Sequence, residues 1–451
     1  MNRNFKVVFS KARGALMVVN EATSSIQAKG TKTVIAAAIA AVAGTAMAAS
    51  AYVEAPTEAG DNVALFTATF GTNTTDKLLA QNSYVTDKSG AAGDAFLAIK
   101  DDEYKLTADH TLWVTGTGAN GQATGIWLKD KGTKATNEST IYVTTGKDGK
   151  PWQNRAMGAS TGEIVNNGTI VAKDAYGMTV GSSSNNTVTI TNGINGKIIV
   201  EDRGVGIELG GLSGQNQTTA TATNYGTITV SAAKDFKDAN YRFATGVAIQ
   251  GDSKNSLTAQ QTFTNKGTID AVDDGYAKAI ELKYVQGAKV NNDGIINGVI
   301  SVGTGATGTT ISLNEASVLN GDISVEGDGT TIKLDDAAVT TGDIIVNSTA
   351  TGDNVQGTTI AATAETGKVS TLTGSILAQQ GSVQQTGSLK AESVVVGTLA
   401  AGTTAATSGT YTVDTGAKLA VESATLNTGT LNVAGELTTG ELTTVKTVKS
   451  E

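Results

Sequence analysis

Two consecutive 21-residue segments decide the fold: Gly308–Asp328, GTTISLNEASVLNGDISVEGD, and Gly329–Thr349, GTTIKLDDAAVTTGDIIVNST. They align without a gap, and eleven of the 21 positions are identical. Each segment contains three short alternations of apolar and polar residues, of which Ile311-Ser312-Leu313 is the first. An alternation with period two places both apolar residues on one side of a strand. Three short strands per repeat, divided by Gly, Asn and Asp, predict coils with three sides.

Looser copies of this pattern run upstream. One recurring element is Asn-x-Gly-x-Ile, which starts at Asn166, Asn224, Asn265 and Asn292. The other is a small residue followed by aliphatic, any and aliphatic residues, which starts at Gly125, Gly177, Gly206, Gly246 and Ala279. We expect the Gly and Asn residues where the chain turns with positive φ, and the aliphatic residues inside. A single coil cannot bury its own apolar side, so the coils must stack.

The predicted fold is therefore all-β: a right-handed parallel β-helix, or three-sided β-solenoid, preceded by an N-terminal signal peptide. The chain is 39% hydrophobic but only 5% aromatic, which suits a narrow interior of Val, Ile, Leu and Ala. Pro56 and Pro151, the two prolines, lie outside the best repeats, as a hydrogen-bonded ladder requires. An array of β-sandwiches is the competing fold, but it would bury a Trp or Tyr in each domain. Residues 301–451 contain one aromatic residue, Tyr411.

The first 48 residues have the pattern of an export signal. The apolar run Val34–Ala43 follows Lys29 and Lys32 and is too short to span a bilayer, which needs ~20 residues. It is followed by Ala46-Met47-Ala48, an Ala-x-Ala cleavage pattern. We predict cleavage after Ala48, with Ala49-Ser50-Ala51 as the second candidate.

The segment before this signal is longer than a secretory signal needs. It contains Met1, Asn2, Arg3, Phe5, Lys6, Val7, Val8, Phe9, Ser10, Ala12, Arg13, Gly14, Val18, Val19, Asn20 and Glu21. In these residues it resembles the extended signal peptide region of autotransporters and related type V secreted proteins of two-membrane bacteria. The family usually has Trp at the position of Phe9 and often a second Trp near Met17. The resemblance implies a route of export through the Sec machinery and does not specify an activity.

The chain divides into four parts by pattern. Residues 1–48 are the extended signal peptide, 49–104 an N-terminal cap region or first strands, and 105–350 the β-helix passenger. Residues 351–451 are simpler in sequence and are predicted as continued solenoid or a partly frayed segment. An autotransporter barrel needs ~10-residue strands with aromatic girdles. Because one aromatic residue follows Tyr284, we expect no translocator barrel to be encoded in this chain.

Composition excludes several classes of function. The chain has no Cys and one His, so cysteine nucleophiles, disulfides and most zinc, haem and iron–sulfur sites are excluded. The net charge is −9, and removing residues 1–48 takes away six basic residues and one acid, which leaves −14. An acidic surface repels phosphate backbones, so we expect no nucleic-acid binding. We predict no catalytic, cofactor-binding or metal-binding residues.

Four weak motifs could contradict that prediction. Gly158–Gly162 fits the G-x-S-x-G nucleophile pattern, which functions only on a strand-to-helix turn with a His nearby. Asp109-His110 has the residue types of one half of a catalytic dyad. The acidic pairs Asp273-Asp274 and Asp335-Asp336 suggest the carboxylates of a pectin-type lyase or hydrolase. We interpret all four as solvated turns or surface charges.

The repeat also predicts stacked acids and exposed aromatic residues. Asp322 should lie one coil from Asp343, and Glu315 one coil from Asp336. Such pairs repel unless water, salt or a cation such as Ca²⁺ screens them. Trp127 and Trp152 and the tyrosines of the irregular coils could contact glycans or proteins, or cover loops.

The function expected from the resemblance is a non-catalytic surface adhesin or self-association protein. Its partner would be a host or bacterial surface ligand or a second copy of itself, which the sequence does not identify. One alternative is a β-helix carbohydrate-active enzyme, which requires acids and a basic residue to converge on adjacent coils. Another is a truncated passenger without independent function. The expected location is the cell surface, the medium or the outer membrane, or the periplasm if no barrel serves the chain.

Overall fold

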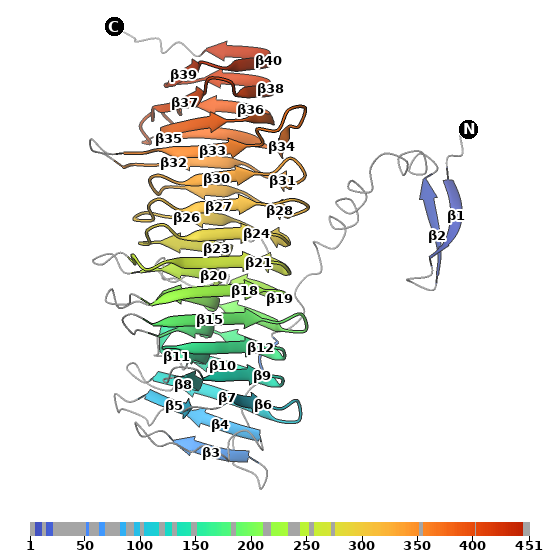
Figure 1. Cartoon of the computed structure of the whole chain (residues 1–451), viewed down its shortest axis with the longest axis vertical. Coiled ribbons are helices and arrows are strands. Elements are labelled where there is room, and N and C mark those ends of the chain that lie inside the picture. Colours follow the sequence, from blue (N-terminus) through green and yellow to red (C-terminus); the bar gives the residue numbers. More distant parts are fainter. Residues whose placement is uncertain are drawn as a thin grey trace. The chain divides into compact units, whose positions relative to one another are not determined.

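The computed structural model of the chain describes two compact units, Met1–Ala48 and Ala49–Glu451 (Figure 1). The described residues are 5–10, 15–20, 51–53, 63–67, 82–86, 94–99, 103–116, 122–128, 133–145, 151–181, 186–210, 218–232, 244–251, 257–271, 276–350, 355–401 and 403–444. In the first unit, β1 (Phe5–Ser10) and β2 (Ala15–Asn20) pair as an antiparallel hairpin. The described residues, in both units, form no helix that is long and apolar enough to cross a membrane.

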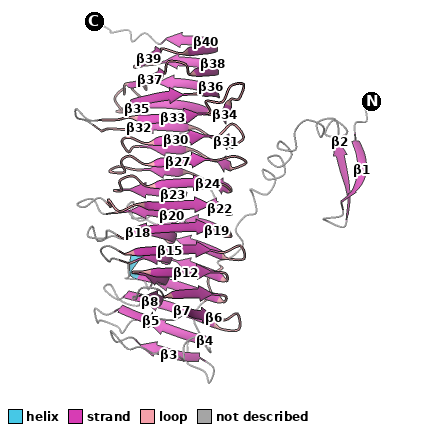
Figure 2. Cartoon of the chain, viewed as in Figure 1, coloured by secondary structure: helices cyan, strands magenta, loops and turns pink. Residues whose placement is uncertain are grey.

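The second unit is a stack of coils with three parallel faces (Figures 1 and 2). Face 1 contains β3 (Val63–Thr67), β4 (Asn82–Thr86), β7 (Thr111–Gly116), β10 (Thr140–Thr145), β13 (Thr169–Lys173), β16 (Lys197–Asp202), β19 (Thr227–Ala232), β22 (Thr268–Ala271), β25 (Ile295–Asn297), β28 (Val318–Asn320), β31 (Val339–Thr341) and β34 (Ser370–Thr373). Face 2 contains β5 (Asp94–Ile99), β8 (Gln122–Leu128), β11 (Asn154–Ala159), β14 (Tyr176–Val180), β17 (Val205–Gly210), β20 (Ala244–Gln250), β23 (Ala277–Lys283), β26 (Ile300–Val302), β29 (Ile323–Val325) and β32 (Ile344–Asn347). Face 3 contains β6 (Glu103–Leu106), β9 (Lys134–Asn137), β12 (Gly162–Asn166), β15 (Thr187–Asn192), β18 (Thr219–Asn224), β21 (Gln261–Asn265), β24 (Lys289–Asn292), β27 (Thr310–Leu313), β30 (Thr331–Leu334) and β33 (Thr358–Ala362).

The predicted parallel β-solenoid is confirmed, and the two 21-residue repeats set its register. Ile311 pairs with Ile332, Val318 with Val339 and Ile323 with Ile344, one pair on each face. The strands β3 to β6 already pair in parallel with β4, β7, β8 and β9, so the described strands between 63 and 106 are the first coils of the stack. The one short 3₁₀ helix among the described residues, η2 (Pro151–Gln153), begins at a proline just before β11.

The interior is one continuous cluster of aliphatic side chains from Leu106 to Ala424. The aliphatic residues of both recurring elements lie in it, and Ile170, Ile207 and Val247 have no exposed surface. Each coil buries its inward residues against the coils before and after it, which is why the coils are stable only as a stack. The repeat pattern therefore predicted the core correctly.

The asparagine of the Asn-x-Gly-x-Ile element has a different role from the one predicted. The side chains of Asn137, Asn166, Asn192, Asn224, Asn265 and Asn292 are fully buried. Each of the first five donates from Nδ2 to Oδ1 of the next asparagine, at 2.8, 2.8, 2.7, 2.8 and 2.9 Å in order, and the last, Asn292, donates to the carbonyl oxygen of Val318. The partners are 29, 26, 32, 41 and 27 residues apart in sequence, so the coils differ in length while this amide ladder keeps its spacing.

The expectation that this element turns with positive φ is wrong for its Asn and Gly residues. The non-glycine residues with positive φ among those described are Asp174, Asp202, Tyr284 and Ala316. Gly267 instead is needed for close approach, because a Cβ there would lie 2.1 Å from the carbonyl oxygen of Gly226 in the coil below. A buried side-chain amide needs hydrogen-bond partners. An asparagine at the same position of each coil provides them, because each amide bonds to the amide of the neighbouring coil.

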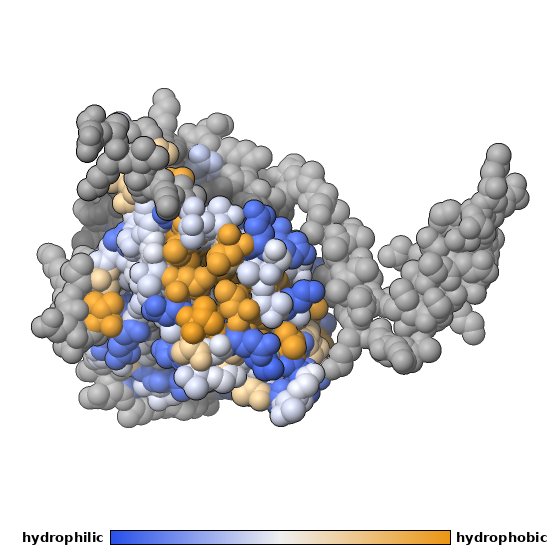
Figure 3. All heavy atoms as spheres, turned by 90° about the horizontal axis from the view of Figure 1, so that it is seen from above, coloured by the Kyte–Doolittle hydropathy of each residue, from blue (hydrophilic) through white to orange (hydrophobic). Residues whose placement is uncertain are grey.

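The stack of parallel strands continues beyond residue 350. Four of its later strands are long: β35 (Ser375–Thr386), β36 (Ser388–Val396), β38 (Lys418–Leu426) and β40 (Glu436–Thr444). Of these, β35 and β36 pair with strands of two faces, and the shorter strands β37 (Gly409–Val413) and β39 (Thr430–Val433) lie between the long ones in sequence. Seen end-on, hydrophobic residues gather in the middle of this end and hydrophilic residues surround them (Figure 3). Val433 of β39 and Leu442 of β40 are 44% and 60% exposed.

Tyr411, the one aromatic residue after Tyr284, lies in the core between Val383 and Leu431. It is fully buried, and its hydroxyl has no hydrogen-bond partner among the described residues. Burial raises the pKa of this phenol, so it stays protonated in the folded state. A buried hydroxyl without a partner costs about 1–3 kcal/mol.

We therefore expect Tyr411→Phe to raise the free energy of unfolding by about 1 kcal/mol, because the ring is kept and the unpaired hydroxyl is removed. Urea denaturation of the wild-type and variant chains measures the difference. Tyr411→Ala is the matched comparison and should destabilise by about 3–5 kcal/mol through the cavity it leaves. A Phe variant that is destabilised by 1 kcal/mol or more would show that the hydroxyl is hydrogen-bonded.

Candidate functional site on the outer side of face 2

The second recurring element builds an outward row of side chains on face 2. Its two aliphatic positions point inward, and the unrestricted position between them points out. In register, strand by strand, this row contains Trp127, Gly158, Thr179, Glu208, Ala248 and Glu281. A neighbouring row contains Arg155, Tyr176, Val205, Thr245 and Lys278. We call these two rows together the face 2 rows.

The small residue of the element separates the two rows. A Cβ on Gly177 would lie 2.5 Å from the carbonyl oxygen of Gly206, and a Cβ on Gly206 would lie 3.2 Å from methyl groups of the core residues Val200 and Ile228. These positions therefore face the crowded corner of the coil, where only a small residue fits. The small residue thereby lets the preceding residue, such as Tyr176, turn outward.

The middle of the face 2 rows, from β14 to β20, is buried although it lies outside the core. Thr179 and Ala248 are 0% and 1% exposed, and Tyr176, Val205 and Ala248 form a small hydrophobic cluster apart from the main one. The segments that join these strands to their neighbours include 182–185, 211–217, 233–243 and 252–256, which lie outside the described residues. The outer side of a solenoid strand is ordinarily solvated, so burial of these outward residues is unusual.

Glu208 is the most unusual residue in these rows. Its side chain is outside the core, yet the residue is only 3% exposed. Burial raises the pKa of its carboxyl group to about 7, although a hydrogen bond from Gln250 Nε2 at 3.1 Å and the charge of Arg155 both lower it. Burial and the Glu208 charge raise the pKa of the Tyr176 phenol above its ordinary value. Glu208 can therefore exchange a proton near neutral pH.

Charged and aromatic groups flank Glu208 on both sides. Lys278 Nζ lies 2.6 Å from Glu281 Oε1, and both side chains are less than 20% exposed. Arg155 lies over the indole ring of Trp127, with Cζ 5.9 Å from the ring centroid. A Cβ on Gly158 or on Gly181 would lie 2.4 Å from the indole ring of Trp127, so these glycines make room for the ring across two coils. The rows thus combine two aromatic rings, two cations and two carboxylates, which suit a polar ligand such as a glycan or peptide.

The G-x-S-x-G segment does not form a nucleophile elbow. Ser160 lies between β11 and β12, and Gly162 has φ of +91°, so the turn joins two strands. His110 lies before β7 on face 1, where its Nδ1 is 2.7 Å from Thr107 Oγ1. Ser160 and His110 therefore lie at different corners of the coil.

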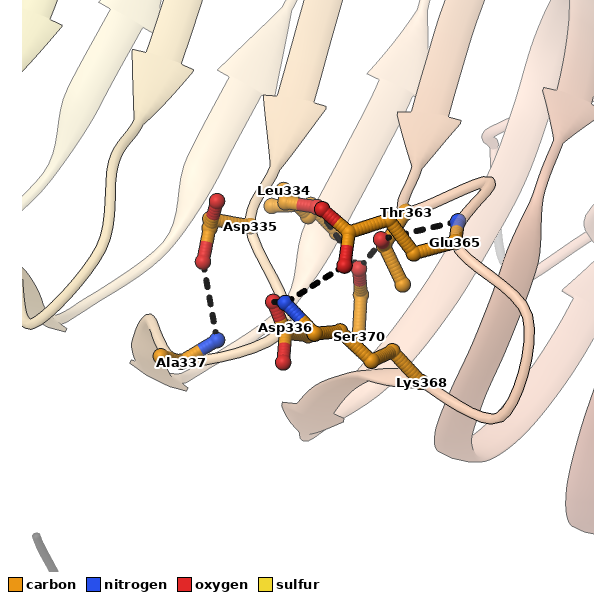
Figure 4. A network of polar contacts seen from close by, with 8 residues as sticks. All are labelled: Leu334, Asp335, Asp336, Ala337, Thr363, Glu365, Lys368 and Ser370. Atoms are coloured by element: carbon orange, nitrogen blue, oxygen red, sulfur yellow. Dashed lines mark hydrogen bonds and ion pairs between the residues drawn. The ribbon is translucent and has the colours of Figure 1, made fainter.

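The acidic pair Asp335-Asp336 is part of a turn between β30 and β31 (Figure 4). Asp335 Oδ1 accepts a hydrogen bond from the backbone N–H of Ala337 at 3.0 Å. Lys368 Nζ lies 3.4 Å from Asp336 Oδ1 and 2.6 Å from Glu365 Oε2. The pair is therefore held by a local turn and by exposed ion pairs, which contribute little to stability.

The predicted stack of Asp322 and Asp343 is present, and backbone donors satisfy it. Asp322 Oδ1 accepts from the N–H of Asp343, and Asp343 Oδ1 accepts from the N–H of Ser375, both at 2.8 Å. Among the described residues, no group of three or more acidic or histidine side chains is arranged to hold a metal ion. The pair Asp273-Asp274, the Trp152 side chain and the predicted cleavage residues Ala46 and Ala48 lie outside the described residues.

Sequence reasoning did not select Glu208, Arg155 or Tyr176. One signal was available, because Glu208 and Glu281 occupy the same unrestricted position of the small-aliphatic-x-aliphatic element. The sequence did not predict that this position is buried, because an outward residue of a solenoid strand is ordinarily exposed.

Residues 1–50 match the family described as the Extended Signal Peptide of Type V secretion system. The match confirms the resemblance drawn from the N-terminal residues, and it supports an autotransporter passenger that is exported by the Sec route. Comparisons with curated proteins and with solved structures gave no match.

Proposed function

We propose that this type V secreted passenger is a non-catalytic surface protein that adheres to a host or bacterial ligand or to a second copy of itself. The observation that carries the proposal is the composition of the face 2 rows. Between β8 and β23 they hold Trp127, Arg155, Tyr176, Glu208 and the Lys278–Glu281 pair. From β26 to β32 the corresponding outward residues are Ser301, Ser324 and Ile345. The aromatic and charged groups that dominate binding energies are thus gathered in one stretch.

The solenoid supports adhesion in a second way. Its strands keep one parallel register along each face, so ligand contacts repeat at the spacing of neighbouring strands, ~4.8 Å. A rigid row of weak contacts binds a repetitive surface polymer with an avidity far above that of any single contact. The same row meets a second copy of the chain without any change of backbone.

Adherence of cells that produce the protein, compared with cells lacking its gene, tests the proposal. Trp127→Ala combined with Arg155→Ala should lower adherence or aggregation about tenfold, because the pair provides the aromatic and cationic contacts. Tyr225→Ala is the matched control, since this tyrosine is 45% exposed, lies outside the face 2 rows and also has a cation, Lys266, over its ring. Equal adherence of producing and non-producing cells would refute the proposed function.

A carbohydrate-active enzyme is the second candidate, and Glu208 is the observation that favours it. Its carboxyl pKa of about 7 suits a general acid, Arg155 is a nearby cation, and Glu281 lies two strands away in the same row. Release of reducing or unsaturated sugars from acidic and neutral polysaccharides, abolished in Glu208→Gln, would establish this candidate. Our proposal expects no such release from either form.

A further inference from the structure

The indole of Trp127 is a fixed aromatic surface on the outer side of face 2. Its six-membered ring occupies the space that two glycines leave, since a Cβ on Gly158 or on Gly181 would lie 2.4 Å from ring atoms. These glycines belong to the two following coils, so the indole extends along the stack. Trp127 is only part-buried, so part of its apolar surface stays open to a ligand. Such a surface packs against the C–H groups of a sugar ring.

Arg155 lies beside this indole and has unused hydrogen-bond donors. It belongs to β11, the strand next to that of Trp127, and its Cζ is 5.9 Å from the ring centroid. Its guanidinium is part-buried, yet no hydrogen bond or ion pair joins it to another residue in the described part of the chain. A guanidinium has five N–H donors in a planar fork. The two oxygens of a carboxylate match that fork.

The charges of the face 2 rows suit an anion, although the whole chain has a net charge of −9. At physiological salt, charges more than about 8 Å away are largely screened, so the nearby groups decide. Lys278 and Glu281 form an ion pair within the rows. Glu208 is buried and exchanges its proton near neutral pH. When Glu208 holds its proton, Arg155 gives the rows a net positive charge.

We infer that the face 2 rows bind a sugar that carries a carboxylate, with its ring against Trp127 and its carboxylate on the guanidinium of Arg155. This inference rests on the proposed adhesive function and names the chemical class of its ligand. An acidic peptide also offers a carboxylate to Arg155, but its backbone has no saturated ring to pack against the indole. The combination of Trp127 and Arg155 therefore favours the acidic sugar.

Glu208 couples the binding of such a sugar to pH. Gln250 Nε2 donates to its carboxyl group at 3.1 Å. The charged and titratable residues of the surrounding strands are Arg155, Tyr176, Lys278 and Glu281. A bound carboxylate disfavours the ionised form of Glu208, because two negative charges repel each other. The affinity for an acidic sugar therefore falls as the pH rises through about 7, the pKa of Glu208.

Calorimetric titration of the purified passenger with three short probes tests the inference. Tetragalacturonate has a carboxylate on every ring, its methyl ester has none, and tetraglutamate with blocked ends has the same charge on a peptide. At about pH 6 and ~150 mM salt, the wild-type protein should bind tetragalacturonate about tenfold more tightly than either of the other probes, because only this probe engages both the indole and the guanidinium. This comparison needs no variant.

Variants assign the two contacts to their residues. Arg155→Ala should remove the preference for tetragalacturonate over its methyl ester, and Arg155→Lys should restore only part of it, because lysine keeps the charge and loses the fork. Trp127→Ala should weaken the binding of tetragalacturonate about tenfold. Tyr225→Ala, the control for adherence, should bind as the wild type does.

The pH profile is a readout that a merely structural role would not change. Between about pH 6 and pH 8.5 the wild-type affinity for tetragalacturonate should fall about tenfold, and Glu208→Gln should have a flat profile. A wild-type profile that is equally flat would overturn the coupling to Glu208. Equal affinity for tetragalacturonate and its methyl ester, equal affinity for tetraglutamate, or no binding of any probe would overturn the ligand class. Because the protein is purified, these results are separate from the adherence of cells, which tests the proposed function.

Discussion

Replacing Asn224 by alanine is expected to lower the free energy of unfolding by about 4 kcal/mol. Asn224 Oδ1 accepts from Asn192 Nδ2 at 2.7 Å, and its own Nδ2 donates to Asn265 Oδ1 at 2.8 Å. The variant loses both hydrogen bonds and leaves a buried donor on Asn192 and a buried acceptor on Asn265. Each unsatisfied buried group costs about 1–3 kcal/mol. Hydrogen exchange should increase first in β18 and β21, since each coil contacts only its neighbours.

Asn320→Ala is the matched control for the ladder. Asn320 also donates to an asparagine of the previous coil, Asn297, at 2.8 Å, but it is only partly buried. Water can replace its partner, so the variant should cost no more than about 1 kcal/mol. Urea denaturation followed by hydrogen exchange measures both variants. If Asn224→Ala and Asn320→Ala destabilise equally, the buried ladder does not have the structural role given to it here.

Glu208→Gln is expected to make the solenoid more stable above pH 7 and no more stable below pH 4.5. The carboxyl pKa rises from 4.5 to about 7 on folding, because burial disfavours the charged form. A raised pKa means that the folded state binds the proton more tightly. The stabilisation that this tighter proton binding gives the folded state is fully present below pH 4.5 and is lost as the pH rises through 7. A shift of that size corresponds to about 3 kcal/mol, and glutamine removes the dependence.

The unfolding midpoint of the wild-type and Glu208→Gln chains between pH 4 and pH 9 measures this effect. Glu281→Gln is the matched control, since it removes a carboxylate from the same row at the position held by the Lys278 ion pair. That variant should keep the part of the pH dependence that Glu208 causes. Parallel curves for the wild type and Glu208→Gln would show that Glu208 is hydrated in the folded protein.

The coil pattern could be predicted from the sequence because it depends on local alternation. Ile311, Val318 and Ile323 each have a counterpart 21 residues later, and each pair is neighbouring in the sheet. The amide ladder was not predicted, although the asparagines themselves were noted. A buried Asn is costly without a partner, and the partner of Asn224 is 41 residues away in a coil of different length. Only the stacking of whole coils shows that the two amides meet.

The candidate site depends on contacts that sequence patterns do not encode. Trp127 was selected as an exposed aromatic residue, and the structure adds the glycines beneath its ring and Arg155 above it. Glu208 occupies the position of the repeat at which any residue is allowed. The sequence of its own strand therefore does not predict that its side chain is buried. The hydrogen bond from the backbone N–H of Ala51 to Glu201 is the extreme case, because these two residues are 150 positions apart in the sequence.

Exposure of the protein on intact cells tests the central claim most directly. Cells that produce the endogenous protein are treated with an external protease, and the passenger is followed together with a periplasmic marker. We predict that the passenger is degraded while the marker stays intact, because a type V secreted adhesin must lie outside the outer membrane. A passenger that survives until the outer membrane is opened would contradict the proposed surface function.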